Sequence, residues 1–371
     1  MLYSLRPQIV GGKPPDQMPR QLRLKGHEFA DRWLDALHFA ASECRRYRKL
    51  KIFFATFLSD SPANSLLAGR PDAVNVTPKV DYWVGTLLNQ DKPRTPGLSF
   101  GVFKSGPNAW TLFTLTETIA NETRLLRLAR SFSPNFSEAY LSSADIRQML
   151  QRLEETHDVH VFVNKAVAYS HRREGQISFK KEPYHAVFNR AEHEGMFVDK
   201  VDFSVRNSRS LHAFIARNGS AKFLDGDIDV FIDSVLTGIV NTTSRRHLLF
   251  QESTRRHGEV EVYPIDIDFG QTAFQDREDN LSFLASLDSM PRSGMGVLHE
   301  NPYVHVSLID FTDGSSFDIF ATTPHAITII PQVDASPFSF NRLCNHIFEN
   351  FHEGKIIKPA PRQWHLQDVL A

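Results

Sequence analysis

The chain has 371 residues, of which 41% are hydrophobic and 23% charged. This length exceeds the size at which a single hydrophobic core usually stops growing, so two or three domains are expected, and the composition excludes a disordered protein. The net charge of −1 argues against a uniformly basic nucleic-acid-binding protein, but residues 1–60 are basic whereas residues 259–320 carry twelve acidic and two basic residues. This asymmetry predicts separate surfaces for separate partners.

Cysteine usage and hydropathy indicate the compartment. The two cysteines, Cys44 and Cys344, are too few and too far apart for a disulfide framework or a cysteine-built zinc site. A reducing cytoplasm is therefore the predicted location. No segment approaches the roughly 18 apolar residues that a membrane-spanning helix requires, so no membrane partner is expected.

The first segment, residues 1–26, is rich in proline, glycine and basic residues, and we expect a basic flexible arm there. From His27 the apolar residues recur at helical spacing, which predicts an amphipathic helix that ends near the basic run at residues 45–49. The aromatic segment 52–58 follows and is typical of a buried strand.

The rest of the chain repeats a pattern of strands followed by one helix. The first group has predicted strands at 83–88, 98–104 and 110–117 and a helix at 119–132, and the second has strands at 201–205 and 211–223 and a helix at 228–240. The third has strands at 303–311, 316–322 and 326–331 and a helix at 340–351. The pattern predicts an α+β fold of mostly antiparallel sheets, each covered by amphipathic helices. Internal duplication is one explanation of these strand-strand-helix units. The general tendency of α+β proteins to place a helix after a hairpin is the other.

A further helix is predicted over residues 143–154, where it would close a first domain. We therefore expect an N-terminal α+β domain at 27–157 and a C-terminal α+β domain at 158–371. The turn-rich stretch 287–296 is expected to be a flexible loop or a second boundary.

The most specific local feature is a repeated group of hydroxyl, arginine and histidine residues. It comprises Arg245, Arg246 and His247 and, ten positions later, Arg255, Arg256 and His257. Guanidinium groups beside hydroxyls suit phosphate oxygens, so these six residues are candidate nucleic-acid contacts. If residues 248–252 form a strand, the two groups grip two points on a polyanion; if they bend back, the groups converge on one anion. The competing interpretation is that these are solvated arginines in weak surface ion pairs.

Further basic residues at 45–49 extend the candidate phosphate-contacting surface. The predicted contacts there are Arg45, Arg46 and Arg48, at the end of the first helix. Positive charge at a helix C-terminus also complements the helix dipole, so these residues have a structural explanation as well.

The acidic segment supports a different hypothesis. Asp266 and Asp268 share one face of a predicted strand, and Asp310 could join them from a neighbouring strand to bind Mg²⁺ or Mn²⁺ for phosphodiester hydrolysis. Against this, residues 259–320 contain no lysine of the kind that many nucleases use, and a solvated strand face explains the two aspartates equally well. Neither a Walker loop nor a complete Gly-x-Gly-x-x-Gly motif occurs, and the histidines lack metal-ligand spacing.

Three functional hypotheses follow. The leading one is a non-enzymatic protein that binds nucleic acid or assembles into a complex through its clustered arginines and histidines, without a cofactor or metal. The alternatives are a metal-dependent phosphodiesterase or nuclease that uses Asp266, Asp268 and Asp310, and an interaction subunit whose acidic segment 259–320 docks a protein partner. Each would suit a component of a defence system, although no residue pattern indicates one, and none predicts an oligomeric state.

Overall fold

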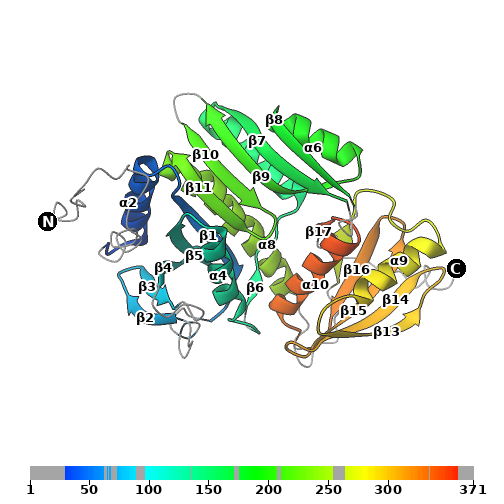
Figure 1. The fold of residues 1–371 in the computed structure, drawn as a ribbon. Coiled ribbons are helices and arrows are strands. Elements are labelled where there is room, and N and C mark those ends of the chain that lie inside the picture. The colour runs from blue at the N-terminus through cyan, green and yellow to red at the C-terminus, as the bar shows by residue number, and fades with distance from the viewer. Residues whose placement is uncertain are drawn as a thin grey trace. The chain divides into compact units, whose positions relative to one another are not determined.

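The computed structural model describes residues 30–61, 65, 67, 73–88, 97–134, 136–170, 175–206, 210–253, 264–333 and 335–357. The described residues form an α+β fold with two antiparallel sheets, which confirms the predicted fold class (Figure 1). The chain divides into two units, Met1–Ser244 (unit 1) and Arg245–Ala371 (unit 2). No helix among the described residues is both long enough and apolar enough to cross a membrane.

Unit 1 is built on an eleven-stranded antiparallel sheet with the order β2-β3-β4-β5-β1-β11-β10-β9-β7-β8, in which β6 pairs with β1. Its strands are β1 Lys51–Leu58, β2 Ala73–Pro78, β3 Tyr82–Leu87, β4 Leu98–Lys104, β5 Ala109–Thr116, β6 Ser137–Glu138, β7 His160–Tyr169, β8 Gln176–Pro183, β9 Phe197–Arg206, β10 Leu211–Ala216 and β11 Ser220–Gly226.

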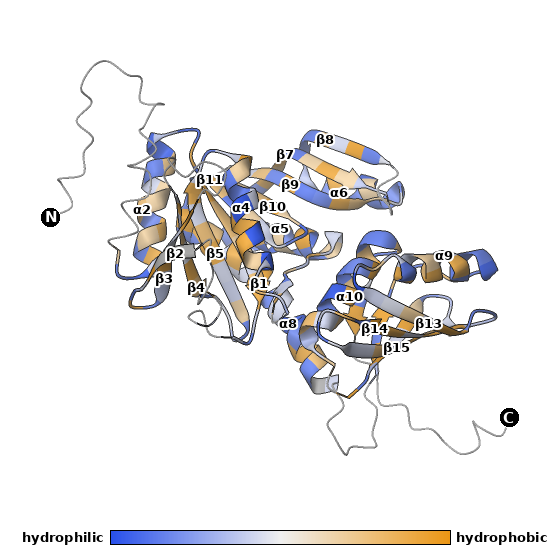
Figure 2. Cartoon of the chain, turned by 60° about the horizontal axis from the view of Figure 1, so that its bottom comes forward, coloured by the Kyte–Doolittle hydropathy of each residue, from blue (hydrophilic) through white to orange (hydrophobic). Residues whose placement is uncertain are grey.

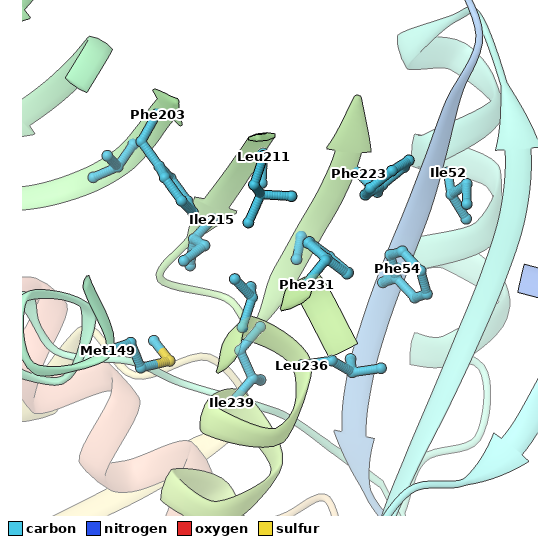
Figure 3. Packing of buried hydrophobic residues seen from close by; sticks show 14 of the residues in the cluster. Ile52, Phe54, Met149, Phe203, Leu211, Ile215, Phe223, Phe231, Leu236 and Ile239 are labelled. Atoms are coloured by element: carbon cyan, nitrogen blue, oxygen red, sulfur yellow. The ribbon is translucent and has the colours of Figure 1, made fainter. Parts of the chain in front are cut away.

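One face of this sheet is covered along much of its width by helices that share a single core with it (Figure 3). The helices are α2 Trp33–Arg46, α5 Ser143–His157, α6 Tyr184–His193, α7 Ile228–Val230, the π-helical η4 Phe231–Leu236 and the start of α8 Thr237–Ser253. Phe54 of β1 and Phe223 of β11 both contact Phe231, at ring-centroid distances of 5.1 and 5.8 Å. The amphipathic stripe predicted over residues 228–240 therefore does face a core.

The opposite face has a smaller core under one helix, α4 Ile119–Arg130. In the sheet, this core draws on β1, β3, β4 and β5, and none of its described members comes from β7, β8, β9, β10 or β11. Strand β1 is buried on both faces because Ile52 and Phe54 enter one core and Phe53 and Phe57 the other. Burial on both faces explains why this strand is an almost continuous apolar run in the sequence, interrupted only by Thr56 after Lys51.

The division of the chain differs from the one that the sequence suggested. A boundary was expected at residues 157/158, yet β1 from before this position pairs with β11 from after it, so both belong to one sheet. The end of the helix at His157 is a connection within unit 1, and the units divide inside α8 instead. The predicted arm at residues 1–26 lies outside the described residues.

Unit 2 contains a six-stranded antiparallel sheet with the order β13-β14-β15-β16-β12-β17. Its elements are β12 Ile265–Asp268, α9 Arg277–Asp288, β13 Ser293–His299, β14 Val304–Asp310, β15 Ser315–Thr323, β16 Ala326–Pro331, α10 Pro337–Asn350 and β17 Lys355–Ile357. Strands β14 and β15 alternate buried and partly exposed residues, as expected for a sheet covered on one face. The stretch 287–296, predicted as a loop or boundary, holds the end of α9 and the start of β13.

Candidate nucleic-acid interface

The structure places the first arginine-histidine group on a helix. Arg245, Arg246 and His247 belong to α8, which continues to Ser253, so of the alternatives considered for residues 248–252 the strand does not occur. His247 is only 2% exposed, with its ring 6.1 Å from that of Phe338. The guanidinium of Arg246 lies 5.9 Å from the centre of the Phe348 ring and its side chain is half-buried, so that of the three residues only Arg245 is exposed. These three side chains therefore do not form one exposed anion site.

The second group, Arg255, Arg256 and His257, lies outside the described residues. The contact of this second group with a polyanion therefore stays a prediction. The helical periodicity explains why the first group does not form one exposed site. Successive residues on a helix point in directions about 100° apart, so only one of the three residues faces solvent.

The arginines at the end of α2 are exposed, as the sequence suggested. Arg45 donates from Nη2 to the carbonyl oxygen of Gly226 at 2.7 Å, and the guanidinium of Arg46 lies 5.3 Å from the centre of the Tyr47 ring. Arg48 follows the helix and is exposed. This end of α2 carries positive charge that remains accessible to an anion.

The three carboxylates proposed for a metal site are not brought together. Asp266 and Asp268 lie on β12, whereas Asp310 lies on β14, and β15 and β16 separate these strands. Three strand spacings correspond to about 14 Å, which is too far for one ion. Asp266 instead accepts a hydrogen bond from Thr328 Oγ1 at 2.6 Å. The described part of the chain contains no group of three histidine, cysteine or acidic residues that could hold a metal ion.

Asp310 is neutralised within unit 2. Its carboxylate accepts hydrogen bonds from Ser339 Oγ at 2.6 Å and Arg342 Nε at 2.8 Å, and Arg342 also bonds to Asp313 at 2.9 Å. Burial by itself raises the pKa of Asp310, but the bonds from Ser339, Thr312 and Arg342 outweigh burial, and its pKa lies below the ordinary value. These contacts attach α10 to the end of β14, which is a structural role.

One sequence pattern could suggest a hydrolase. Residues 97–101 read Gly-Leu-Ser-Phe-Gly, which has the Gly-x-Ser-x-Gly spacing of a nucleophile elbow. The elbow requires a sharp turn between a strand and a helix, whereas Ser99 is buried inside strand β4. The pattern therefore carries no nucleophile here.

A feature that the sequence analysis missed lies on strands β7 to β10 of unit 1. One face of these strands belongs to the helix-covered core; we call the other face, which contributes to neither core of unit 1, the open face (Figure 2). Lys165 on β7 and Lys180 on β8 are directly opposite each other, and both are exposed on the open face because their neighbours Ala166 and Phe179 point into the core.

Lysines occupy a further strand of the open face. Lys200 on β9 lies opposite Val167, two residues after Lys165 on β7, and forms an ion pair with Asp199 at 3.3 Å. Lys165 lies opposite Asp202 on β9, but the carboxylate of Asp202 accepts hydrogen bonds from Asn164 and contacts His212 Nε2, each at 2.9 Å. Among the described residues no carboxylate forms an ion pair with Lys165 or Lys180.

Aromatic and polar side chains lie on the same open face as these lysines. Phe162 of β7 is 38% exposed, and Phe214 of β10 is partly exposed with Lys222 Nζ 4.6 Å from its ring centre. The hydrogen bond to Asp202 raises the pKa of His212, which favours the charged form of this histidine. The alternation of exposed and buried residues along β7 was a signal that could have located this face in the sequence.

Comparison with known proteins gives no functional information, since no protein-family model and no curated protein sequence matches this chain.

Proposed function

We propose that unit 1 binds single-stranded nucleic acid on the open face of β7, β8, β9 and β10. The observation that carries the proposal is the cross-strand pair of Lys165 and Lys180. Two like charges directly opposite each other destabilise a sheet, and no carboxylate of the described residues forms an ion pair with either of them. A phosphate group at this position would relieve the repulsion and bind both ammonium groups.

The surroundings of the pair support a nucleic acid rather than a free anion. Exposed aromatic rings on strands provide surfaces on which bases stack, in combination with lysines that follow the backbone. Phe162 and Phe214 supply such rings, and Asn164 and His212 supply polar groups beside them. Arg45, Arg46 and Arg48 at the end of α2 are candidates for additional phosphate contacts.

A competing explanation is that lysines on an edge strand prevent unwanted strand pairing. It accounts for Lys180, because β8 is an edge strand. It does not account for Lys165 or Lys200, because β7 and β9 both lie inside the sheet. We therefore favour ligand binding for the open face as a whole.

The test is a fluorescence-anisotropy titration of the full chain with single-stranded RNA, single-stranded DNA and duplex DNA of mixed sequence, at several salt concentrations. We expect the single strands to bind more tightly than the duplex. The double variant Lys165→Gln/Lys180→Gln should weaken binding and reduce the steepness of log K against log salt by roughly 0.7, the contribution of the one phosphate that the pair holds.

Lys104→Gln is the control, because Lys104 is exposed at the end of β4, away from the strands of the open face, and the substitution removes one positive charge where the double variant removes two. The proposal fails if no single strand binds, or if Lys104→Gln affects binding as much as the open-face variant does. It also fails if substitutions at Arg45, Arg46 and Arg48 abolish binding while the open-face variant leaves it unchanged.

A further inference from the structure

The four edge strands of the two sheets differ in how they are protected against pairing with another chain. Strand β8 carries two lysines, a glutamate and a proline, β2 ends in Pro78, and β17 has only three residues. Strand β13 is seven residues long and contains neither a charged residue nor a proline. Charges, prolines and short length are among the devices that block an exposed sheet edge, and β13 lacks all three. Its pairing with β14 is irregular only near its end, between Val297 and His299, so the edge is regular from Ser293 to Val297.

Within the part of the chain that the structure describes, no strand pairs with the outer side of β13, whose backbone presents hydrogen-bonding groups there. The carbonyl oxygen of Arg292 accepts from the amide of Phe311 at 2.8 Å, and the strand continues in the same register through Val297. In an antiparallel pair, residues alternate between bonding to the neighbour and pointing away from it. Gly294 and Gly296 therefore face β14, whereas the N–H and C=O groups of Ser293, Met295 and Val297 point away from the sheet.

Apolar side chains concentrate around this edge. Six of the twelve exposed large hydrophobic side chains found among the described residues lie on β13, on β14 and its flanking residues, or on α9: Leu281, Val297, Leu298, Tyr303, Ile309 and Phe311. Of these six, the most exposed are Leu298 and Phe311, at 62% and 63%. The Phe311 ring lies across Gly294, so a larger residue at position 294 would displace this ring. Val297 lies on the same side of the sheet as buried Val306, whereas Ile309 lies on the other side, so exposed apolar side chains flank this edge on both faces. Exposed apolar side chains beside an open edge are typical of a protein–protein contact.

We propose that β13 is the site at which a second copy of this chain binds, by antiparallel pairing of the two β13 strands about a two-fold axis through Gly296. Centring the pair on Gly296 sets Met295 opposite Val297 of the partner subunit, and both belong to the outward-facing set. Each strand then satisfies the outward N–H and C=O groups of the other, as in a closed, isologous dimer.

The charges at the two ends of β13 favour a second copy over an unrelated strand. Arg292 precedes the strand and Glu300 follows it, and both are exposed. Antiparallel pairing about Gly296 brings Arg292 of one chain and Glu300 of the partner subunit to the same end of the interface, so opposite charges come together at both ends. Glu300 also bonds to Arg277 at 2.9 Å within its own chain, which leaves its second oxygen for the partner. No like charges on β13 oppose the pairing.

The first test is sedimentation velocity of the full chain over a concentration series. We expect the sedimentation coefficient to rise from the monomer to the dimer value. Met295→Pro should abolish the rise, since it removes an outward N–H from each subunit, and each lost hydrogen bond corresponds to roughly tenfold in the dissociation constant. The monomer should keep its thermal stability, because this N–H makes no bond to β14 and proline is tolerated at such an edge position.

Side-chain variants separate the interface from a general effect of the substitution. Val297→Lys should weaken the dimer, whereas Ile119→Lys, an equally drastic change on the exposed side of α4, should not. Arg292→Glu and Glu300→Arg should each weaken it, and the double variant should restore it. The proposal is overturned if the chain stays monomeric at every concentration, which would leave the edge to a different strand or to none. It is also overturned if a dimer forms that neither Met295→Pro nor Val297→Lys affects.

Discussion

Asp310 shows how unit 2 accommodates a charged side chain in its interior. The residue is 0% exposed and stands at the end of the buried face of β14. Hydrogen bonds from Ser339 and Arg342 compensate the charge, and Asp313 shares the same arginine. A buried ion pair of this kind contributes little net stability, but the loss of one partner leaves the other charge buried and unpaired.

We therefore predict that Arg342→Met lowers the free energy of unfolding by about 3–5 kcal/mol, because Asp310 loses its cation while remaining buried. Chemical denaturation followed by tryptophan fluorescence and circular dichroism measures the change. Arg147→Met is the control, since Arg147 pairs with Glu192 at the surface, 3.4 Å away, and should cost less than about 1 kcal/mol. Equal losses in the two variants would contradict the structural role of Arg342.

At the scale of single elements, the start of α5 is fixed by a capping box. Ser142 Oγ accepts from the Asp145 amide at 3.1 Å, and the Asp145 carboxylate accepts from the Ser142 amide at 2.8 Å. These bonds satisfy amides that have no partner inside the helix. The inward face of α5 carries Met149 and Leu150 into the larger core of unit 1, so the cap also positions core residues.

Ser142→Ala should lower the stability of unit 1 by about 1 kcal/mol, the usual cost of losing an N-cap side chain. Thermal denaturation monitored by circular dichroism tests this. Ser42→Ala is a suitable comparison, because Ser42 is an exposed serine inside α2 and alanine is the better helix former there. An unchanged melting temperature for Ser142→Ala would mean that the core alone fixes the helix start.

At the scale of the whole molecule, we expect the two units to differ in their response to acid. The carboxyl groups of unit 2 include Asp310, whose pKa is lowered, and Asp313, whose pKa the bonds from Ser336, Ser315 and Ser339 lower to about 2 in spite of burial. A group with a lowered pKa in the folded state stabilises that state above its unfolded pKa of about 3.9 and loses this contribution as the pH falls toward its folded pKa.

We predict that unit 2 loses stability before unit 1 as the pH falls from about 4 toward about 2. Hydrogen exchange measured by mass spectrometry should show β14 and α10 losing protection while β1 and β11 keep theirs. Asp313→Asn should make the unfolding free energy of unit 2 less dependent on pH in this range. Simultaneous loss of protection in both units would show that the carboxylates of unit 2 do not control the transition.

The sequence predicted the elements whose pattern is local and strong. The limits of β4 match the expected strand 98–104 at both ends, and the buried strand at residues 52–58 and the helix stripe that includes Phe231 and Val235 occur as predicted. The spacing of apolar residues indicates which side chains are buried, and the burial of those side chains favours a strand or a helix locally. The α+β class follows from the succession of such elements alone.

Tertiary structure decided which residues meet. The order of strands in the sheet of unit 2 is what separates Asp310 from Asp266 and Asp268. The pairing of β7 with β8 is what places Lys165 opposite Lys180. The continuation of α8 through Arg245 and His247 likewise follows from the fold, since His247 is buried against Phe338. Periodicity along the chain fixes the inward and outward sides of an element, but the choice of neighbour depends on contacts between residues distant in sequence, which no local pattern encodes.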